Sequence, residues 1–530
     1  MSTPFRRVLL LAALSGYVAL SWEIVWARLY NYVTGSKAVA FGAMLGSYLL
    51  GLAIGSLLSM RWQKKESQAS LRSLVLLMLS AGLLAFLVVP LASWLVVPLP
   101  AEKWVWLGES LGSVNLPGWA FSLPLVAVAA ALQGTVLPLL CHVAIAPDHR
   151  AGARLSYVYL ANIIGSGAGS LLTGFVLMDC FKLQTIAGIL TVAAVLLVVL
   201  VAGKQAFRQA VSAVVATVLL AAAAATGWVH QGLWERLYWK DQYGGQAPFA
   251  FVQETRHGVV TVDQNRHVYG NGAYDGVINT TLEPGDYHVR PYFISAVHPA
   301  PLKRVLVIGV SAGAWTQIIA SHPDQPQVDC VEISHGYLEV IRAYPQVSSI
   351  LDHPDRIRIH IDDGRRWLKR NPDARFDCIL MNTTHHWREF ASALLSKEFL
   401  TLAKRHLNPD GVVMWNCTDS GRAAKTGMEV FPHTMMCLNN CIGANVPLVP
   451  DKEHWRKVLT AYRIDGRPLY DLTTEKDRSD LEKVLSICDR EADPMPEDAA
   501  FRWWIVNRQR MERLWGGERP ITDDNLGHEY

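Results

Sequence analysis

The sequence predicts a polytopic α-helical membrane domain followed by an α/β domain that is built on a doubly wound sheet. Three observations support this prediction. Residues 1–230 contain long apolar runs and only 14 Lys/Arg and 6 Asp/Glu, whereas the whole chain of 530 residues has 49 and 46. Residues 301–425 alternate short apolar runs with helical segments, which is typical of parallel strands joined by crossover helices. Residues 231–300 combine short β-branched runs with turn pairs, which indicates a small β-rich entry subdomain.

The overall composition excludes several classes of protein. Hydrophobic residues make up 51% and charged residues 18%, which excludes a disordered chain and, with the long apolar runs, a single soluble globule. Eight Cys at irregular spacings are too few for a disulfide-dense secreted scaffold. The soluble half has no basic stripe, so nucleic acid is not an expected partner. We assign residues 426–530 to a C-terminal helical extension, and self-association as a homo-oligomer stays open.

Seven apolar runs are long enough to cross about 30 Å of hydrocarbon. They are approximately 8–27, 38–59, 72–98, 119–145, 155–178, 185–203 and 209–229. The first is not a cleaved signal peptide, because it continues into Trp22-Glu23-Ile24-Val25-Trp26 without a small-x-small cleavage site. The second and fifth runs are rich in glycine, so we expect helix backbones to pack closely there. These glycines are Gly42, Gly46, Gly51, Gly55, Gly165, Gly167, Gly169 and Gly174.

Glu23 lies near the end of an apolar segment, where a carboxylate is costly unless it is paired or lies at the membrane interface. Two interpretations stay open. The flanking Trp22, Trp26 and Arg28 favour an interfacial belt. The alternative is a polar site inside the helical bundle, shared with Asn162 of the fifth run.

The distribution of positive charge predicts the orientation in the membrane. If the segment before the first run is cytoplasmic, ten Lys/Arg flank the runs on the cytoplasmic side and four on the other side, as the positive-inside rule favours. We therefore predict a multi-pass protein of a bacterial-type inner membrane, with its soluble half in the cytoplasm. This orientation needs an even number of crossings, so one run does not span. The candidates are the fifth run, which contains Asn162, Ser166 and Ser170, and the first, which contains Glu23.

The soluble half begins with the β-rich entry. Residues 251–254 and 258–262 predict two short strands, because they are rich in β-branched and apolar residues. Two dipeptides that favour hairpin turns follow, Asn271-Gly272 and Asp275-Gly276.

Five apolar runs then predict the strands of the main sheet. They cover residues 304–308, 328–333, 357–361, 376–381 and 412–415, with a turn expected over 408–411 and helices ending near 320, over 336–344 and over 397–406. In a doubly wound sheet, ligands bind at the carboxyl ends of the strands. The glycine and polar residues that follow these runs are therefore the expected ligand site.

Three features at these strand ends indicate an adenosine-containing ligand. Gly309, Ser311 and Gly313 form a loop after the first strand that can bring backbone N–H groups toward the ligand. Glu332 ends the second strand, where its carboxylate can accept both ribose hydroxyls. The third strand ends in Asp362-Asp363-Gly364, where a carboxylate can hold an adenine amino group. These features alone do not choose between NAD and S-adenosylmethionine (SAM).

The order of the motifs resembles the spermidine synthase (polyamine aminopropyltransferase) family over roughly residues 250–420. The resemblance implies a Rossmann-like sheet of the type shared by SAM methyltransferases and spermidine synthases, with Glu332 as the ribose-binding acid and Asp363-Gly364 on the adenine side. The other residues that carry it are Asp286-Tyr287-His288, which is similar to the family's Tyr-His gatekeeping segment, then His298-Pro299, the run Val305-Leu306-Val307-Ile308-Gly309, and the closing Thr522-Asp523-Asp524. The segment from Trp22 to Arg28 looks like that of bacterial membrane-fused members.

The sequence departs from the family pattern at two places. The family's loop has an Asp that grips the amine of the aminopropyl donor, where this chain has Ala312. The family's fourth strand ends in Asp-Ser-Ser-Asp-Pro, whose acids activate and hold a cationic acceptor. Here the run is Asn382-Thr383-Thr384-His385-His386. A diamine would therefore meet a neutral or partly cationic pocket. We predict Asn382, His385, His386, Tyr287 and His288 as catalytic residues, and Thr383 as a contact of the nucleoside.

These departures predict an integral membrane enzyme that cleaves SAM, or its decarboxylated form, to 5′-methylthioadenosine. One route transfers an aminopropyl-type group to an acceptor, with His385 or His386 as the base. The other is a SAM lyase, in which the donor's own carboxylate attacks its γ-carbon and homoserine lactone is released. Ala312 leaves room for that carboxylate. The alternatives are a SAM-dependent methyltransferase, which would release S-adenosylhomocysteine, and a nucleoside-sensing transporter without chemistry.

The expected partners follow from this interpretation. They are a small nucleoside substrate, SAM or decarboxylated SAM, and the lipid bilayer. No metal is expected, because Cys437 and Cys441 lack a matching second pair of ligands.

Overall fold

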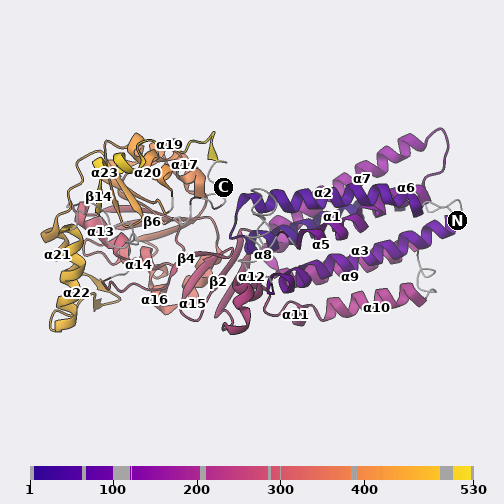
Figure 1. The fold of residues 1–530 in the computed structure, drawn as a ribbon, viewed down its shortest axis with the longest axis horizontal. Helices are drawn as coiled ribbons and strands as arrows, with labels where there is room; N and C mark the ends of the chain where they lie inside the picture. Colours follow the sequence, from indigo (N-terminus) through magenta and orange to yellow (C-terminus); the bar gives the residue numbers. More distant parts are fainter. Residues whose placement is uncertain are drawn as a thin grey trace. The chain divides into compact units, whose positions relative to one another are not determined.

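A computed structural model of the chain describes residues 5–62, 67–98, 120, 122–202, 210–284, 288–298, 300–382, 386, 388, 391–418, 420–489 and 505–526. The chain forms two compact units. The first comprises residues 1–259 with 271–273, and the second comprises residues 260–270 with 274–530. Figure 1 shows the first as a set of long helices and the second as a sheet with helices around it.

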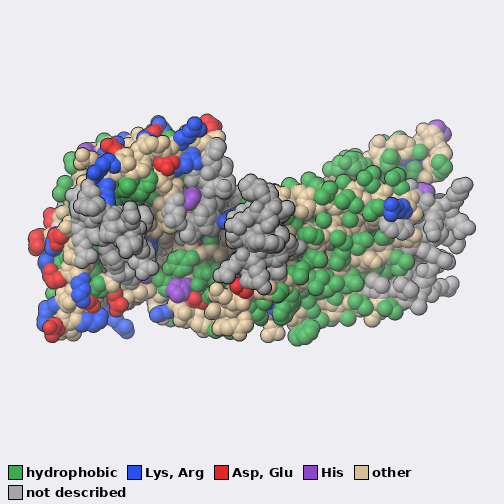
Figure 2. Space-filling view, in the orientation of Figure 1, with side chains coloured by type: hydrophobic (Ala, Val, Ile, Leu, Met, Phe, Trp, Pro, Cys, Tyr) green, Lys and Arg blue, Asp and Glu red, His purple; other side chains and the backbone are tan. Residues whose placement is uncertain are grey.

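The helical unit contains six segments, among the described residues, that are long and apolar enough to cross a membrane. They are built from α1 (Phe5–Val33), α2 (Ala38–Ser59), α3 (Ser67–Val96), α5 (Leu123–Gly134) with α6 (Val136–Ala144), α7 (Ala151–Leu172) continuing through a π-helical turn to α8 (Met178–Cys180), and α9 (Leu183–Ala202). Apolar side chains cover the surface of this unit in Figure 2. This confirms the predicted membrane-type helical half.

Among the described residues, six of the seven apolar runs form helices of spanning length, but the run that falls short is neither of the two candidates that we expected. The first and fifth runs, which we considered as the non-spanning candidates, form full-length helices α1 and α7. The seventh run instead forms α10 (Ala210–Ala224), followed by the four-residue α11 (Thr226–Val229). At about 1.5 Å per residue, fifteen residues reach roughly 22 Å, which is less than the hydrocarbon thickness of about 30 Å. Apolar composition alone does not reveal where a helix stops.

Glycines bring pairs of helices into backbone contact. A Cβ placed on Gly165 of α7 would overlap the carbonyl oxygen of Ala13 of α1, and one placed on Gly55 of α2 would overlap the carbonyl oxygen of Ala131 of α5. Gly51 and Gly169 make similar approaches, as we expected. Gly42, Gly46 and Gly167 face open space instead, because a helix presents only every third or fourth residue to a given neighbour.

Gly165→Ala is therefore expected to destabilise the helical unit by about 1–3 kcal/mol, because the added methyl group forces α1 and α7 apart. Gly167→Ala is the matched control: it lies on the same helix, nothing lies within 4 Å of its added Cβ, and it should leave stability unchanged. Thermal unfolding of the two full-length variants in detergent provides the comparison. Equal midpoints would contradict the packing role of Gly165.

The second unit contains the mixed main sheet of eight strands, in the order β14-β10-β11-β9-β8-β5-β6-β7. Its parallel part consists of β5 (Arg304–Ile308), β6 (Gln327–Glu332), β7 (Ile357–Ile361), β8 (Phe376–Met381) and β9 (Leu407–Asn416). These strands agree with the five predicted runs, although the expected turn over 408–411 is part of β9. The chain runs from β5 outward to β6 and β7, and then returns to β8 on the other side of β5. The switch point therefore lies between β5 and β8.

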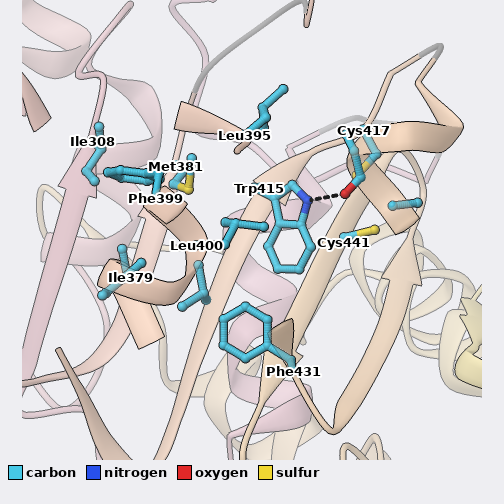
Figure 3. Close-up of a cluster of buried hydrophobic side chains, with 14 of the residues drawn as sticks. Ile308, Ile379, Met381, Leu395, Phe399, Leu400, Trp415, Cys417, Phe431 and Cys441 are labelled. Carbon is cyan, nitrogen blue, oxygen red and sulfur yellow. Dashed lines mark hydrogen bonds between the residues drawn. The ribbon is translucent and has the colours of Figure 1, made fainter. Parts of the chain in front are cut away.

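Helices cover both faces of this sheet. They include α14 (Ala314–Ala320), α15 (Gly336–Ala343), α17 (Gly364–Arg370), α19 (Lys397–Arg405) and α20 (Gly421–Val430). The core in Figure 3 joins Ile379 of β8 and Trp415 of β9 to Phe399 of α19 and Phe431, all almost fully buried. The Trp415 indole N–H donates to the carbonyl of Ala423 at 3.3 Å, so this large side chain is buried without an unsatisfied donor.

The C-terminal segment extends the sheet. We predicted a helical extension over 426–530, and α21 (Lys452–Ala461), α22 (Glu475–Leu485) and α23 (Arg508–Trp515) are indeed helices. However, β10 (His433–Cys437), β11 (Asn440–Ala444) and β14 (Ile505–Asn507) add antiparallel strands to the main sheet. These strands are short and largely buried. They therefore lack the alternation of apolar and polar residues by which a half-exposed strand is recognised in a sequence.

A separate four-stranded sheet precedes the main sheet. It consists of β1 (Phe251–Thr255), β2 (Gly258–Val262), β3 (His267–Gly270) and β4 (Ala273–Val277) in chain order. Asn271-Gly272 forms the predicted hairpin turn, with positive φ at both residues. The second predicted turn is wrong: Asp275 and Gly276 lie inside β4.

Candidate active site

A cavity of about 470 Å³ lies at the carboxyl ends of β5, β8 and β9, beside the switch point of the main sheet. Its described lining comes from β4, the start of α13 (Val289–Val297), the loop after β5 with the start of the following helix, the ends of β8 and β9, and the turn between β10 and β11. The polar lining residues are Tyr274, Asp275, His288, Arg290, Ser311, Asn382, Asn416, Thr418 and Asn439, with Ala312 and Trp315 among the apolar ones. This is the position at which a doubly wound sheet binds its ligand.

The glycine loop after β5 adopts a conformation that its sequence requires. Gly309 has φ +85°, and a Cβ there would lie 2.7 Å from the carbonyl oxygen of Asn382. Gly313 has φ +79° and precedes α14. Ser311 also has positive φ, and its hydroxyl donates to the carbonyl of Asp275 at 2.5 Å, which fixes the loop against β4. Only glycine allows β5 and β8 to approach this closely at position 309.

Glu332 ends β6 and is 4% exposed. Its carboxylate accepts the N–H of Val310 and the N–H of Ser334, both at 2.9 Å. Burial raises the pKa of this carboxyl above its usual 4.5. The structure thus places Glu332 directly behind the glycine loop, where it holds the backbone of two strand-end loops. Its contact with a ribose stays a prediction.

The acidic pair after β7 occupies a more open position. Asp363 caps α17, since its carboxylate accepts the N–H of Arg366 at 2.8 Å. Asp362 pairs with the side chains of Arg366 and Arg370. Gly364 lies close to β5, because a Cβ there would lie 2.7 Å from Cγ2 of Ile308. Neither acid is among the residues that line the 470 Å³ cavity, so their contact with an adenine ring also stays a prediction.

The predicted catalytic residues are only partly described. Asn382 and His288 line the cavity. The Nδ1 atom of His386 lies 3.1 Å from the carbonyl oxygen of Thr418, itself a lining residue. A carbonyl oxygen can only accept, so Nδ1 carries a proton, and Nε2 can accept one whenever the ring is neutral. Tyr287, Thr383 and His385 lie outside the described residues.

The structure also reveals a buried ion pair that sequence reasoning missed. The Asp275 carboxylate accepts hydrogen bonds from the Arg388 guanidinium and the Tyr337 hydroxyl, and Arg388 also donates to the carbonyl of Gly270 at 3.0 Å. A Cβ on Gly270 would overlap Tyr337 and Asp275. Burial by itself lowers the pKa of Arg388. The contacts with Asp275 and Tyr337 raise this pKa by more than burial lowers it, so Arg388 remains charged. The Asp-Gly dipeptide resembled a turn, which concealed Asp275 as a site residue.

Arg290 is the second missed residue. It lies on α13, and its guanidinium donates to the Asn439 side chain at 3.1 Å and lies 4.8 Å from the centroid of the Trp315 ring. Stacking on an indole and bonding to an amide orient the guanidinium. No motif in the sequence marks Arg290, because its partners come from α14 and from the turn between β10 and β11.

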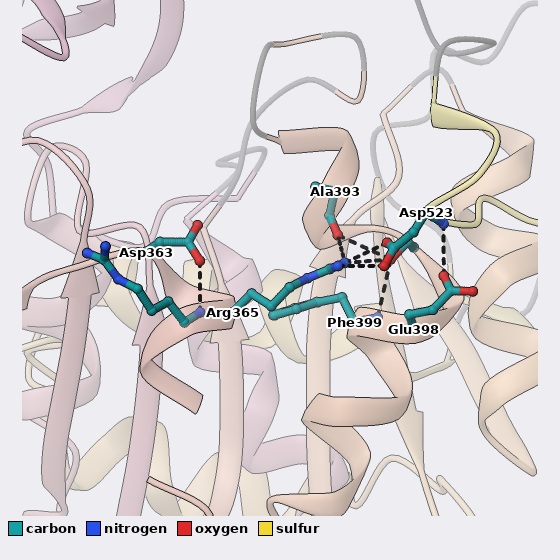
Figure 4. A network of polar contacts seen from close by, with 8 residues as sticks. Asp363, Arg365, Ala393, Glu398, Phe399 and Asp523 are labelled. Carbon is teal, nitrogen blue, oxygen red and sulfur yellow. Dashed lines mark hydrogen bonds and ion pairs between the residues drawn. The ribbon is translucent and has the colours of Figure 1, made fainter. Parts of the chain in front are cut away.

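The closing Thr522-Asp523-Asp524 segment has a structural position. Both Asp523 carboxylate oxygens accept from Arg365, at 2.7 and 2.9 Å, and its N–H donates to Glu398. Figure 4 shows Arg365 reaching from the start of α17 to Asp523, with the Ala393 carbonyl beside it. The C-terminal segment therefore ties α17, which follows Asp363, to the start of α19.

Comparison with known proteins identifies the family. Residues 294–421 match the family model described as the spermine/spermidine synthase domain. A polyamine aminopropyltransferase of Streptococcus pneumoniae is 34% identical over 217 residues, which cover 36% of this chain and 72% of that protein. The chain belongs to the polyamine aminopropyltransferase (spermine/spermidine synthase) family. This confirms the resemblance on which the site prediction rests.

Other polyamine aminopropyltransferases match over different lengths. That of Streptococcus uberis is 32% identical over 160 residues, which cover 29% of this chain and only 55% of that protein. Polyamine aminopropyltransferase 2 of Streptomyces coelicolor is 26% identical over 407 residues, 74% of this chain and 70% of that protein. Because 407 residues exceed the length of 231–530, this similarity includes part of the helical half. A solved spermidine synthase in complex with the transition state analogue AdoDATO has 18% identity and a TM-score of 0.36, and covers 46% of this chain and 89% of that chain.

Within the described ranges, no group of three or more His, Cys, Asp or Glu side chains is arranged to hold a metal ion. Cys437 and Cys441 are both fully buried, in β10 and β11. Burial raises the pKa of the Cys441 thiol well above its usual value, which favours the neutral thiol over the thiolate that binds metals.

Proposed function

We propose that the α/β unit binds SAM and cleaves it to 5′-methylthioadenosine by intramolecular attack. The family membership supports an adenosyl sulfonium as the ligand. The distribution of charge in the cavity supports SAM itself over its decarboxylated form, and this is the observation on which the proposal rests.

Asp275 is the only carboxylate among the described residues that line the cavity, and it is paired with Arg388. Arg290 provides an oriented positive charge in the same cavity. Ala312 and Asn382 stand where the family pattern has acids. A cationic diamine would therefore find no free negative charge among these residues, whereas the α-carboxylate of SAM would find a guanidinium.

The reaction requires little from the protein beyond positioning. The SAM carboxylate oxygen forms a bond to the γ-carbon, while the bond from that carbon to the sulfonium sulfur breaks. The electron pair stays on sulfur, so methylthioadenosine leaves as a neutral thioether and homoserine lactone remains. No proton is transferred, which is compatible with a cavity whose only carboxylate among the described residues, Asp275, is held in an ion pair. Arg290 would orient the carboxylate, and exclusion of water would protect the reacting carbon.

Product analysis tests this proposal. Purified full-length protein is incubated with SAM, or with decarboxylated SAM and putrescine, and the products are identified by mass spectrometry. We expect methylthioadenosine and homoserine lactone from SAM alone. S-adenosylhomocysteine would instead show a methyltransferase, and tight binding without turnover would favour a nucleoside sensor.

Arg290→Gln is expected to raise KM for SAM by about 10- to 100-fold, because a charge-assisted contact with the carboxylate is worth about 1.5–3 kcal/mol. Binding of methylthioadenosine, which has no carboxylate, should be unchanged. Arg342→Gln is the matched control, since the Arg342 side chain is 57% exposed and pairs with Glu339 on the same helix, α15. An equal loss of affinity for SAM and methylthioadenosine would argue against a carboxylate contact.

Aminopropyl transfer is the second candidate, and the relatives' activity as polyamine aminopropyltransferases favours it. The orientation of His386 gives it an acceptor at Nε2 that could take the proton of an attacking amine. Formation of spermidine from decarboxylated SAM and putrescine, at rates well above the SAM reaction, would establish this function and displace the lyase.

We also propose that the protein lies in a bacterial-type inner membrane with its α/β unit in the cytoplasm. Six crossings return the chain to the side from which it starts, which agrees with the positive-inside distribution. A cytoplasmic site would have access to SAM. A fluorescent reporter fused after Tyr530 should be active, whereas alkaline phosphatase activity there would place the unit outside.

A further inference from the structure

The helical unit contains a cavity of about 350 Å³. It shares no lining residue with the candidate active site of the α/β unit. All six candidate spans contribute to its lining, from α1, α2, α3, the α5–α6 segment, α7 and α9. Apolar side chains make up most of the wall. Because the cavity lies between membrane spans, a polar group there has few alternatives to a protein or ligand partner.

Among the residues that the structure describes, three polar atoms in this wall have no hydrogen-bond partner. They are Nε1 of Trp22, the hydroxyl of Tyr48 and Oε1 of Gln133, on α1, α2 and α5. Trp22 is 0% and Tyr48 is 1% exposed. By contrast, the neighbouring Trp26 donates its indole N–H to the carbonyl of Ala85. Unpartnered buried polar groups are rare and costly, so three around one cavity indicate a polar ligand.

The backbone of the fourth span is interrupted beside this cavity. Pro138 has no N–H, so the carbonyl of Gly134 cannot receive the usual helical hydrogen bond, and α5 ends there. The hydroxyl of Ser56 on α2 donates to that carbonyl at 3.1 Å. Gln133 is thereby placed at a helix break that α2 holds in position. Interrupted spans of this kind commonly carry membrane binding sites.

Glu23 is a buried acid beside this cavity. Its side chain is 8% exposed, and it follows the wall residue Trp22 on α1. Among the described residues, no cation lies within ion-pair distance of its carboxylate, whereas Asp179, the other acid in the six spans, pairs with Arg256 at 3.5 Å. The Trp22 and Trp26 rings stack, and the Trp26 and Tyr48 rings meet edge to face, so this part of the bundle is rich in aromatic rings whose faces carry partial negative charge. Both features favour a cation.

We propose that this cavity binds a small organic ammonium compound within the membrane. Its N–H groups would donate to Gln133 Oε1 and to the Tyr48 hydroxyl oxygen, and its hydrocarbon part would lie against the apolar part of the wall. Glu23 lies outside the lining and acts through its charge. This inference does not depend on the reaction proposed for the α/β unit.

Three probes that share a phenethyl skeleton test the proposal: phenethylamine, 2-phenylethanol and 3-phenylpropanoate. Each is titrated calorimetrically into full-length protein in detergent, and titration into empty micelles is subtracted. We expect saturable binding of phenethylamine, weaker binding of 2-phenylethanol and no binding of 3-phenylpropanoate. Tyr48→Phe and Gln133→Leu should each weaken phenethylamine binding about tenfold. Glu23→Gln should abolish the preference for the amine over the alcohol.

Tyr157→Phe is the matched control, because Tyr157 is a 59% exposed residue of α7 outside the cavity lining. Tyr48→Phe removes only an oxygen that has no partner, so this variant should remain folded, with an unchanged or higher unfolding temperature. Absence of saturable binding would overturn the proposal. Equal binding of all three probes, or binding unaffected by both Tyr48→Phe and Gln133→Leu, would overturn it as well.

Discussion

Replacing Arg388 with Met should lower the stability of the α/β unit by about 3–5 kcal/mol, because it leaves the Asp275 carboxylate buried without its counterion. The side chains of Asp275 and Arg388 are only 7% and 16% exposed. The Tyr337 hydroxyl remains as a partner, but one neutral donor does not replace a guanidinium. Asp275 also accepts the Ser311 hydroxyl through its carbonyl, so the glycine loop should loosen together with β4.

Hydrogen exchange of peptides from β4, β5 and β8 in the full-length protein measures this loss within the α/β unit. The double variant Asp275→Asn/Arg388→Met should recover most of the stability, because neither charge is then buried alone. Arg342→Met, which removes an exposed arginine, should change exchange by less than about 1 kcal/mol. If Arg388→Met and Arg342→Met behaved alike, the ion pair would have no structural role.

Replacing Glu332 with Ala should weaken SAM binding by roughly 10²- to 10⁴-fold, if both ribose hydroxyls donate to this carboxylate. Charge-assisted hydrogen bonds contribute about 1.5–3 kcal/mol each. The variant also loses the acceptor for the N–H groups of Val310 and Ser334. Glu332→Gln separates the loss of the ribose contact from the loss of the backbone contacts only in part, because its amide NH₂ group would face one of those N–H groups. Isothermal calorimetry and thermal unfolding should be measured for both variants.

The pH dependence gives an independent test of Glu332. Burial raises the pKa of this carboxyl above 4.5, and protonation removes the acceptor that the ribose needs. SAM affinity should therefore decrease as the pH falls through this raised value, beginning above pH 4.5. Glu332→Gln should lack that step. Glu339→Gln, an exposed change on α15, should retain the wild-type profile. Wild-type affinity in a folded Glu332→Ala protein would exclude the ribose contact.

The sequence alone determined those elements whose signal is local. The runs 304–308, 357–361 and 376–381 are strands with the predicted bounds, because central parallel strands are continuous apolar segments between polar ends. Gly309, Glu332 and Asp363 were placed at the ends of β5, β6 and β7 by the same logic. The apolar character of residues 1–230 likewise determined a membrane-type helical half, since hydrocarbon requires long apolar helices.

Only the tertiary structure decided the features that depend on partners far apart in the chain. Asp275 read as a turn residue because its dipeptide is typical of turns, yet Arg388, 113 residues away, holds it in a strand. The role of Arg290 depends on Trp315 and Asn439, and the membrane cavity is formed by side chains from all six spans. Ion pairs and cavities are formed by residues that are neighbours in space but distant in the chain. Local sequence patterns and composition therefore do not reveal them.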